Sequence, residues 1–347
     1  MIRWGIIGCG DVTEVKSGPG FQLADGSKLQ AVMRRDADKA ADYAKRHGVA
    51  QWYSSADALI HDKAVDAVYI ATPVSSHMEY ALQVCAAGKP CYVEKPPARN
   101  LTECRRMQSA FAEAKLPLYV AYYRRALPRF IKARELIQST ALGQITGINY
   151  TFTQPRHKEE HAATVPWRLD AQHSGGGVFM DMGCHTLDIL DFMLGPLENV
   201  TGRAFNLTGS YNIEDYVDML FTAVDGAPGT ASWNFSGDAR EDMINITGTA
   251  GQLQLSTFGN EPLRLKRGTN PPEEIALPNP QHIQQPLIQT IVDDLSGRAE
   301  CPSTIATALR TAAVMDKVLD EYYGGRQDAF WARPATWPGC ARVQRKT

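Results

Sequence analysis

The sequence predicts two domains: an α/β domain with a doubly wound parallel sheet, then an α+β domain with a large, mostly antiparallel open sheet. The chain has 347 residues, more than one hydrophobic core usually serves. Short apolar runs alternate with helical patterns over roughly the first 125 residues, as in a parallel sheet. After about residue 145 strand-like runs follow one another, and several alternate apolar and polar residues. We expect the domains to span 1–123 and 124–347, and the final helix or tail is a candidate to pack back on the first.

In the first domain a helix is expected between Asp36, as its N-cap, and Gly48, as its left-handed C-cap. Ser76 and Glu79 have the spacing of a capping box, which predicts a second helix beginning there. The expected strands are Arg3–Ile7, Lys28–Met33, Val65–Ala71, Cys91–Val93 and Leu118–Ala121.

The second domain should place helices on one face of its sheet. The other face would then be free to join subunits, so we expect a homodimer or homotetramer through this sheet. The expected strands lie within Gly143–Gln154, Val217–Val224, Gly229–Ser236, Asp242–Gly251 and Gln252–Phe258, and the helices near Phe179–Leu194, Ile283–Leu295 and Ile305–Tyr323.

Charge and composition exclude several classes of protein. The 36 Lys and Arg against 38 Asp and Glu give a net charge of −2, which provides no basic field for nucleic acid or an anionic membrane. No apolar run approaches the roughly 18 residues of a membrane-spanning helix, and the apolar N-terminus is too short for a signal peptide. The seven cysteines are scattered without a CxxC pair, which favours free thiols and no metal site. We therefore expect a soluble cytoplasmic protein.

A glycine-rich turn follows the first strand. Gly8 would permit a tight turn, and Gly10 would let the backbone approach a pyrophosphate. Asp11 and Val12 open a helix whose free N–H groups favour a bound anion. The third glycine of the usual pattern is Thr13, which we expect to crowd helix-to-strand packing slightly. The context favours a Rossmann dinucleotide-binding domain over an ordinary tight turn.

The end of the second strand bears on the choice of cofactor. Sites that prefer NAD usually place an acidic residue there to bind the ribose hydroxyl, but this chain has Arg34 followed by Arg35. Two guanidinium groups would suit a 2′-phosphate, and Asp36 is better explained as a helix cap. The sequence thus favours NADP with NAD as the alternative; the other interpretation is that both arginines are simply solvated.

The tetrapeptide Glu94-Lys95-Pro96-Pro97 follows another parallel strand, at the edge where doubly wound sheets bind ligands. Lys95 could present its ammonium to a substrate hydroxyl and exchange a proton with it. The proline pair would fix the backbone, with a cis bond as one way of doing so. The alternative is a solvated lysine at the end of a strand.

Three glycines, Gly175–Gly177, precede a helical pattern that carries Asp181 and His185. A separation of four residues places this carboxylate and imidazole on one helix face. The carboxylate can orient the imidazole and stabilise its protonated form, as a proton relay requires. The alternative makes Asp181 a first-turn helix residue and His185 a core histidine.

Taken together these motifs are specific. The glycine turn, Ala71-Thr72-Pro73 with His77, Glu94-Lys95-Pro96 and the run GGGVFMDMGCHTLD over 175–188 occur in one order and spacing. With them the chain resembles, over nearly its whole length, the glucose-fructose oxidoreductase / inositol dehydrogenase / rhizopine-catabolism (Gfo/Idh/MocA) family.

The resemblance implies roles for particular residues. Lys95 with Asp181 and His185 would be catalytic and handle the proton. Tyr123 and Arg124 belong to a segment bordering the active site, where tyrosines replace the usual asparagine-containing version. The residues implied to bind the cofactor are Gly8, Gly10, Asp11, Val12, Arg34, Arg35, Thr72, Pro73, His77, Glu94, Lys95, Trp167 and Arg168; those implied to bind substrate are Lys95, Tyr123, Arg124, Arg168, Asp181 and His185.

The activity that the resemblance implies is hydride transfer between NADP and a hydroxyl or carbonyl carbon of a sugar, cyclitol or related polyol. Two alternatives come from the same superfamily: a glycoside hydrolase that uses the nucleotide transiently, and a non-catalytic sensor that only binds it. The loop Pro155–Val165 is expected to shape selectivity. The tail after Tyr323 is either a docking arm or ordinary surface.

Overall fold

The computed structural model of the chain describes residues 1–139, 141–156 and 166–341, which form two compact units. The expected boundary after residue 123 lies four residues before Leu127, where the second stretch of unit 1 ends. After the second sheet the chain returns to unit 1 over Pro280–Leu309, so a single boundary does not divide the two units. Unit 1 comprises Met1–Arg99, Glu103–Leu127 and Pro280–Leu309, and unit 2 comprises Asn100–Thr102, Pro128–Asn279 and Arg310–Thr347.

Unit 1 contains the predicted parallel sheet, in the order β3-β2-β1-β4-β5-β6. Each pair of neighbouring strands is parallel, and β1 lies between β2 and β4, so the winding reverses beside it. The sequence prediction missed only β3. The strands are β1 Ile2–Ile7, β2 Ser27–Met33, β3 Gln51–Tyr53, β4 Ala67–Ile70, β5 Cys91–Val93 and β6 Leu118–Val120.

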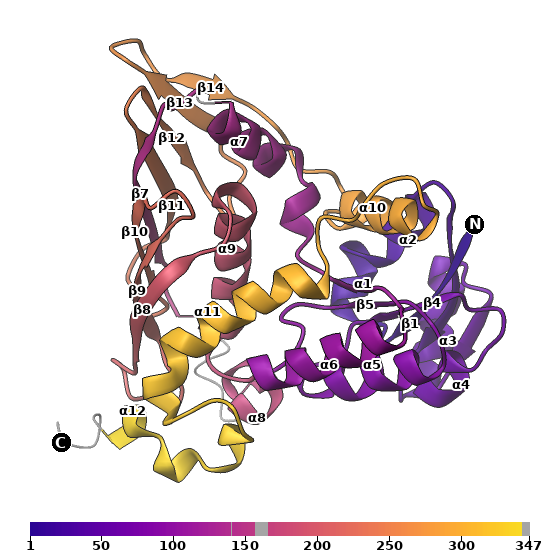
Figure 1. The fold of residues 1–347 in the computed structure, drawn as a ribbon. Helices are drawn as coiled ribbons and strands as arrows, with labels where there is room; N and C mark the ends of the chain where they lie inside the picture. Colours follow the sequence, from indigo (N-terminus) through magenta and orange to yellow (C-terminus); the bar gives the residue numbers. More distant parts are fainter. Residues whose placement is uncertain (140, 157–165, 342–347) are drawn as a thin grey trace. The chain divides into compact units, whose positions relative to one another are not determined.

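The helices of unit 1 pack around this sheet, and α5 and α6 lie side by side (Figure 1). Asp36 caps α3 by accepting from the N–H of Lys39, and Gly48 ends it at φ 65°, both as predicted. The capping box at Ser76 is wrong: a 3-10 turn precedes α5, and the Ser76 hydroxyl donates to Thr72 and Pro73 instead. The helices are α1 Asp11–Val15, α2 Gly18–Leu23, α3 Ala37–His47, α4 Ala56–Ile60, α5 His77–Ala86, α6 Leu101–Glu113 and α10 Gln285–Leu295.

Unit 2 contains an eight-stranded sheet in the order β14-β13-β12-β11-β7-β10-β9-β8. Only β10 and β7 run parallel, so the sheet is mostly antiparallel, as predicted. The prediction missed β8, β13 and β14. The strands are β7 Ile145–Thr153, β8 Glu198–Phe205, β9 Tyr216–Thr222, β10 Pro228–Asn234, β11 Glu241–Gly248, β12 Gly251–Leu255, β13 Leu263–Arg267 and β14 Glu273–Ile275.

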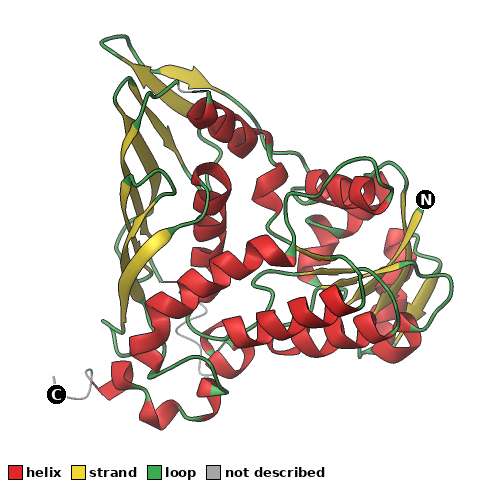
Figure 2. Ribbon diagram, in the orientation of Figure 1, coloured by secondary structure: helices red, strands yellow, loops and turns green. Residues whose placement is uncertain are grey.

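Helices α7 and α9 cover one face of this sheet (Figure 2). Phe179 of α9 packs edge-on against Trp233 of β10, with 4.9 Å between ring centroids. The opposite face is largely polar, and on it Leu220 of β9 is 58% exposed between Thr201 and Thr230. The helices are α7 Pro128–Gln138, α8 Ala171–Ser174, α9 Val178–Leu194, α11 Ile305–Tyr323, most of which belongs to unit 2, and α12 Pro338–Ala341.

Two findings bear on the predictions from composition. Across the described ranges no helix is both long and apolar enough to cross a membrane. All seven cysteines lie in the described ranges, none of them forms a disulfide there, and six of them are buried.

Candidate functional site

The candidate residues of unit 1 gather at the carboxyl edge of its sheet. Ile7, Ile70, Val93 and Val120 lie in register across β1, β4, β5 and β6. The residues that follow these strands therefore emerge along one edge, which is where doubly wound sheets bind nucleotides. They are Gly8 and Gly10 after β1, Thr72 and Pro73 after β4, Glu94 and Lys95 after β5, and Tyr123 and Arg124 after β6.

The glycine turn after β1 fits a pyrophosphate. Gly8 has φ 91°, and a Cβ there would lie 2.7 Å from Thr72 Cγ2, so only glycine fits this approach of two loops. A Cβ on Gly10 would meet only the Gly8 carbonyl oxygen, at 3.9 Å, which leaves open space beside the backbone. The first N–H groups of α1, including those of Asp11 and Val12, have no acceptor within their own helix. The turn can thus hold a bound phosphate.

Thr13 does not crowd the packing, because its side chain folds back on the turn. Its hydroxyl donates to the Gly10 carbonyl at 2.8 Å and accepts from the Gly10 N–H at 3.0 Å, while the residue is fully buried. The Tyr43 hydroxyl of α3 donates to the Thr13 carbonyl at 2.8 Å. These bonds fix the conformation of the turn.

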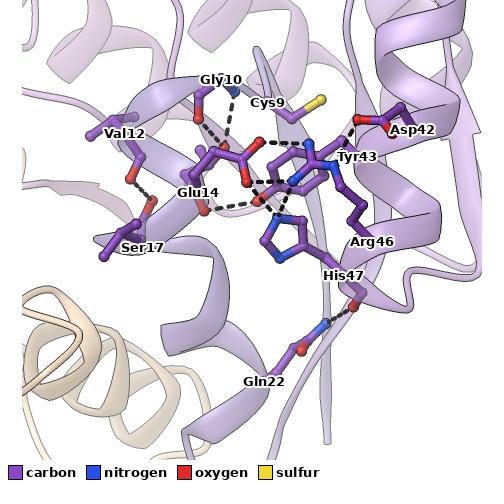
Figure 3. Close-up of polar contacts among 12 residues, drawn as sticks. Cys9, Gly10, Val12, Glu14, Ser17, Gln22, Asp42, Tyr43, Arg46 and His47 are labelled. Atoms are coloured by element: carbon purple, nitrogen blue, oxygen red, sulfur yellow. Dashed lines mark hydrogen bonds and ion pairs between the residues drawn. The ribbon is translucent and has the colours of Figure 1, made fainter.

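An ion-pair cluster ties α1 to α3 beside the turn (Figure 3). Glu14 accepts from both terminal nitrogens of the Arg46 guanidinium at 2.8 Å and lies 2.7 Å from His47 Nε2. Asp42 accepts from Arg46 Nε at 2.7 Å. The hydrogen bond from Arg46 is the main cause that lowers the pKa of Glu14 to about 2. The cluster therefore holds the two helices together at neutral pH.

Arg34 reaches the glycine turn, because its Nη1 donates to the Cys9 carbonyl at 3.3 Å. Arg35 is exposed beside it. Asp36 is used by its own helix, where the Lys39 N–H lowers the pKa of its carboxyl. The position after β2 thus presents the guanidinium groups of Arg34 and Arg35. The carboxylate of Asp36, which follows them in the sequence, caps α3.

The loops after β4 and β5 are joined by His77. Its Nδ1 lies 3.0 Å from the Pro96 carbonyl oxygen and its Nε2 lies 2.8 Å from that of Thr72. Burial lowers the pKa of His77, against the effect of the two carbonyls. Both ring nitrogens face the chain itself, so this side chain holds Thr72 and Pro96 in place.

Glu94 and Lys95 have different surroundings. The Glu94 carboxylate is buried and accepts from the hydroxyl of Tyr69 at 2.6 Å and the amide of Gln284 at 2.7 Å. It also accepts from the Lys95 N–H at 3.1 Å. Lys95 itself is half-buried, and its bond to Pro96 is cis, as the proline pair suggested. The carboxylate thus fixes the backbone from which the lysine side chain extends.

Tyr123 and Arg124 lie in a 3-10 turn, Tyr123–Ala126, after β6. Both are buried, and the Arg124 guanidinium lies over the Tyr123 ring, 4.8 Å from its centroid. Their predicted contact with substrate stays a prediction.

In unit 2 the structure brings Trp167, Arg168 and Asp181 together. The Arg168 guanidinium lies 4.7 Å from the centroid of the Trp167 ring, and its Nε is 3.7 Å from Asp181 Oδ2. Trp167 is 41% exposed and the Asp181 carboxylate is half-exposed. A carboxylate paired with arginine in this way can orient a polar ligand.

His185 lies one turn further along α9 and is almost buried. The ring of Phe258 meets it edge-on, with 6.0 Å between centroids. Asp181 and His185 both lie on α9, four residues apart, as predicted. The loop Pro155–Val165 falls mostly in 157–165, outside the described residues.

Several residues that build these sites were missed from sequence. The sequence predicts slight crowding at Thr13 rather than a hydrogen-bonding role, although its spacing of three from Gly10 is that of a capping box. Gln284 and Tyr69 hold Glu94 from distant parts of the chain, and no local pattern marks them. Glu214 and Arg326 are buried ionisable residues, and the sequence around them carries no motif that marks them.

The parallel sheet, its reversal beside β1 and the glycine turn define a Rossmann dinucleotide-binding domain. Residues 2–122 match the model of the oxidoreductase family with an NAD-binding Rossmann fold, and residues 130–254 match that of the GFO/IDH/MocA C-terminal domain. The chain belongs to the Gfo/Idh/MocA oxidoreductase family. It is an NAD(P)-dependent oxidoreductase.

Individual relatives span most of the chain. Oxidoreductase P35 from Formosa agariphila is 36% identical over 316 residues, 91% of this chain and 97% of that protein. The 1,5-anhydro-D-fructose reductase of Ensifer adhaerens is 29% identical over 73% of this chain and 75% of its own. The solved structure of levoglucosan dehydrogenase in complex with NADH and levoglucosan has a TM-score of 0.81 over 92% of this chain and 96% of its own. At 19% identity that likeness is one of fold.

Proposed function

We propose that the protein transfers a hydride between NADP and a hydroxyl or carbonyl carbon of a sugar, cyclitol or related polyol. The observation that carries this proposal is the edge of the parallel sheet, where a phosphate-fitting turn and Lys95 emerge from strands in register. Relatives named as a reductase of 1,5-anhydro-D-fructose and a dehydrogenase of levoglucosan support a carbohydrate substrate.

The protein's part in the reaction is binding, orientation and proton transfer. The bound nicotinamide supplies the hydride acceptor or donor. In oxidation the substrate carbon loses a hydride while its hydroxyl loses a proton. Lys95, or His185 assisted by Asp181, takes that proton, and in reduction the same group returns it. Tyr123, Arg124 and Arg168 are proposed to contact the substrate.

NADP is the proposed cofactor because Arg34 and Arg35 stand where an NAD site usually has a carboxylate. Gly8, Gly10, Asp11 and Val12 would hold the pyrophosphate. The other proposed cofactor residues follow β4 and β5 or come from unit 2: Thr72, Pro73, His77, Glu94, Lys95, Trp167 and Arg168.

The test is reduction of NADP⁺ and NAD⁺ across a panel of sugars, cyclitols and diols. Lys95→Met should lower turnover by about 10²–10⁴ if the lysine handles the proton. Lys89→Met is the matched control, because Lys89 precedes β5 at the opposite edge of the sheet, where it donates to the Asp62 carbonyl. Near-normal turnover by Lys95→Met would contradict the role of Lys95. Release of a leaving group without net reduction would indicate the hydrolase, and tight binding without turnover the sensor.

A further inference from the structure

The helix that carries Asp181 and His185 begins at an intrinsically flexible turn. The triglycine loop, Gly175–Gly177, has φ 82° at Gly175 and 158° at Gly176, and Gly177 is the N-cap of α9. Glycine has no side chain to cap the helix and has more backbone freedom than any other residue. Whatever fixes this loop therefore also fixes the first turn of α9.

Glu214, which precedes β9, supplies the missing cap. Its Oε1 accepts from the Gly177 N–H at 2.8 Å, and its Oε2 accepts from the Tyr323 hydroxyl at the end of α11. A Cβ on Gly177 would lie 2.4 Å from the Glu214 carbonyl oxygen, so loop and glutamate are in direct contact. Glu214 is 1% exposed, and burial raises its pKa.

Arg326 holds the other end of the loop. Its Nη1 donates to the Gly175 carbonyl at 2.9 Å, and its Nε donates to Asp316 at 2.8 Å. The guanidinium carbon lies over both the Phe330 and the Tyr323 ring, 4.3 and 5.0 Å from their centroids, and the residue is 0% exposed. Burying a charge costs free energy unless the charge is paired and hydrogen-bonded. The bonds of Arg326 to Asp316 and to the Gly175 carbonyl offset this cost, so they are part of the packed structure.

We propose that Glu214, Tyr323 and Arg326 form a clamp that positions the triglycine loop and, through it, Asp181 and His185 for proton transfer. The inference rests on the proposed function. The three are positioning residues, because they act through the backbone of the loop. The tail after Tyr323, which supplies Arg326 and Phe330, is then part of the scaffold of the site rather than a docking arm.

The test compares two adjacent tyrosines of α11. Tyr323→Phe removes only the hydroxyl that reaches Glu214, whereas Tyr322→Phe removes a hydroxyl that donates to the Asn212 carbonyl at 2.8 Å instead. Because displacement of a catalytic group by about 1 Å can cost about 10²-fold, we expect Tyr323→Phe to lower kcat by about 10- to 100-fold. The dinucleotide Kd should stay within about twofold, because Tyr322→Phe and Tyr323→Phe both leave the glycine turn of unit 1 intact.

Glu214→Gln adds a rescue arm. The amide keeps an oxygen that can accept from the Gly177 N–H, so this variant should retain more activity than Glu214→Ala. Equal losses in Glu214→Gln and Glu214→Ala would overturn the capping role. Equal kcat values in Tyr323→Phe and Tyr322→Phe, or a loss of thermal stability alone, would overturn the clamp.

Amide hydrogen exchange separates failure of this inference from failure of the proposed function. Exchange over 174–181 should accelerate in Tyr323→Phe and remain unchanged in Tyr322→Phe, whatever reaction the enzyme catalyses. Unchanged exchange in both variants would contradict the clamp even if the wild type oxidises a sugar. Accelerated exchange in Tyr323→Phe, with a wild type that turns over no substrate, would keep the clamp and reject the proposed function.

Discussion

Neighbouring residues at this edge of the sheet have different proposed tasks: some would take part in the reaction, and others support the backbone. The Glu94 carboxylate accepts hydrogen bonds from Tyr69 and Gln284. It also accepts from the Lys95 N–H and so holds the backbone from which the Lys95 side chain extends. His77 likewise uses both ring nitrogens on carbonyl groups. On the proposed function, a motif identified from the sequence combines residues that meet the ligand with residues that place them.

Arg34 should decide the cofactor. A charge-assisted hydrogen bond to the 2′-phosphate contributes about 1.5–3 kcal/mol, so Arg34→Ala should raise KM for NADP by about 10- to 100-fold and leave that for NAD nearly unchanged. The control is Arg106→Ala, an exposed arginine of α6. Steady-state kinetics with both dinucleotides provide the measurement, and an unchanged NADP-to-NAD ratio would refute the preference.

Glu14 predicts a dependence of stability on pH. Its folded pKa of about 2 lies below its usual value of 4.5, so its stabilising contribution is complete above pH 4.5 and is lost as the pH falls toward 2. Glu14→Gln should therefore destabilise the protein at pH 6, and its difference from wild type should shrink below pH 4.5. Urea unfolding of both proteins from pH 6 to 3 measures this. Glu79→Gln, whose carboxylate accepts a long bond of 3.4 Å from Gln83, serves as the control. A pH-independent difference for Glu14→Gln would contradict the assignment.

At the scale of elements, prediction succeeded where local pattern and burial agree. Helix α3 was predicted to the residue because Asp36 and Gly48 mark both ends, and β5 because it is a short, fully buried apolar run. Exposed or short strands such as β3 and β14 carry no such pattern and were missed. The clamp on α9 could not be predicted, because Glu214 and Arg326 meet the loop only after the chain has folded.

The entry to α9 should tolerate no side chain. Gly177→Ala places a Cβ 2.4 Å from the Glu214 carbonyl oxygen, and overpacking of this kind costs about 1–3 kcal/mol. Gly147→Ala in β7 is the matched control, since its Cβ would meet nothing within 4 Å and should leave stability equal or slightly higher. Denaturant unfolding gives both free energies, and equal values for the two variants would show that the contact relaxes freely.

At the scale of the whole molecule, the open face of the eight-stranded sheet is proposed to join subunits. Helices α7 and α9 cover its other face, and Leu220 is 58% exposed among polar side chains on the open one. The predicted homodimer or homotetramer would bury this residue.

Leu220→Asp should therefore weaken association. Sedimentation equilibrium of the wild type should give a multiple of 38.2 kDa, and the variant should shift toward the monomer mass. Leu23→Asp changes an equally exposed leucine, 57% exposed on α2, and should leave the mass unchanged. A wild type that is monomeric at micromolar concentration would reject this interface.

Isotope tracing follows the proposed hydride transfer itself. A sugar that supports turnover is deuterated at the reacting carbon, incubated with the enzyme and NADP⁺, and the recovered dinucleotide is analysed by NMR. Hydride transfer should place one deuterium at C4 of the reduced nicotinamide for each carbonyl formed, and this transfer should be lost in Lys95→Met but not in Lys89→Met. Substrate cleavage with no deuterium retained in the dinucleotide would contradict it.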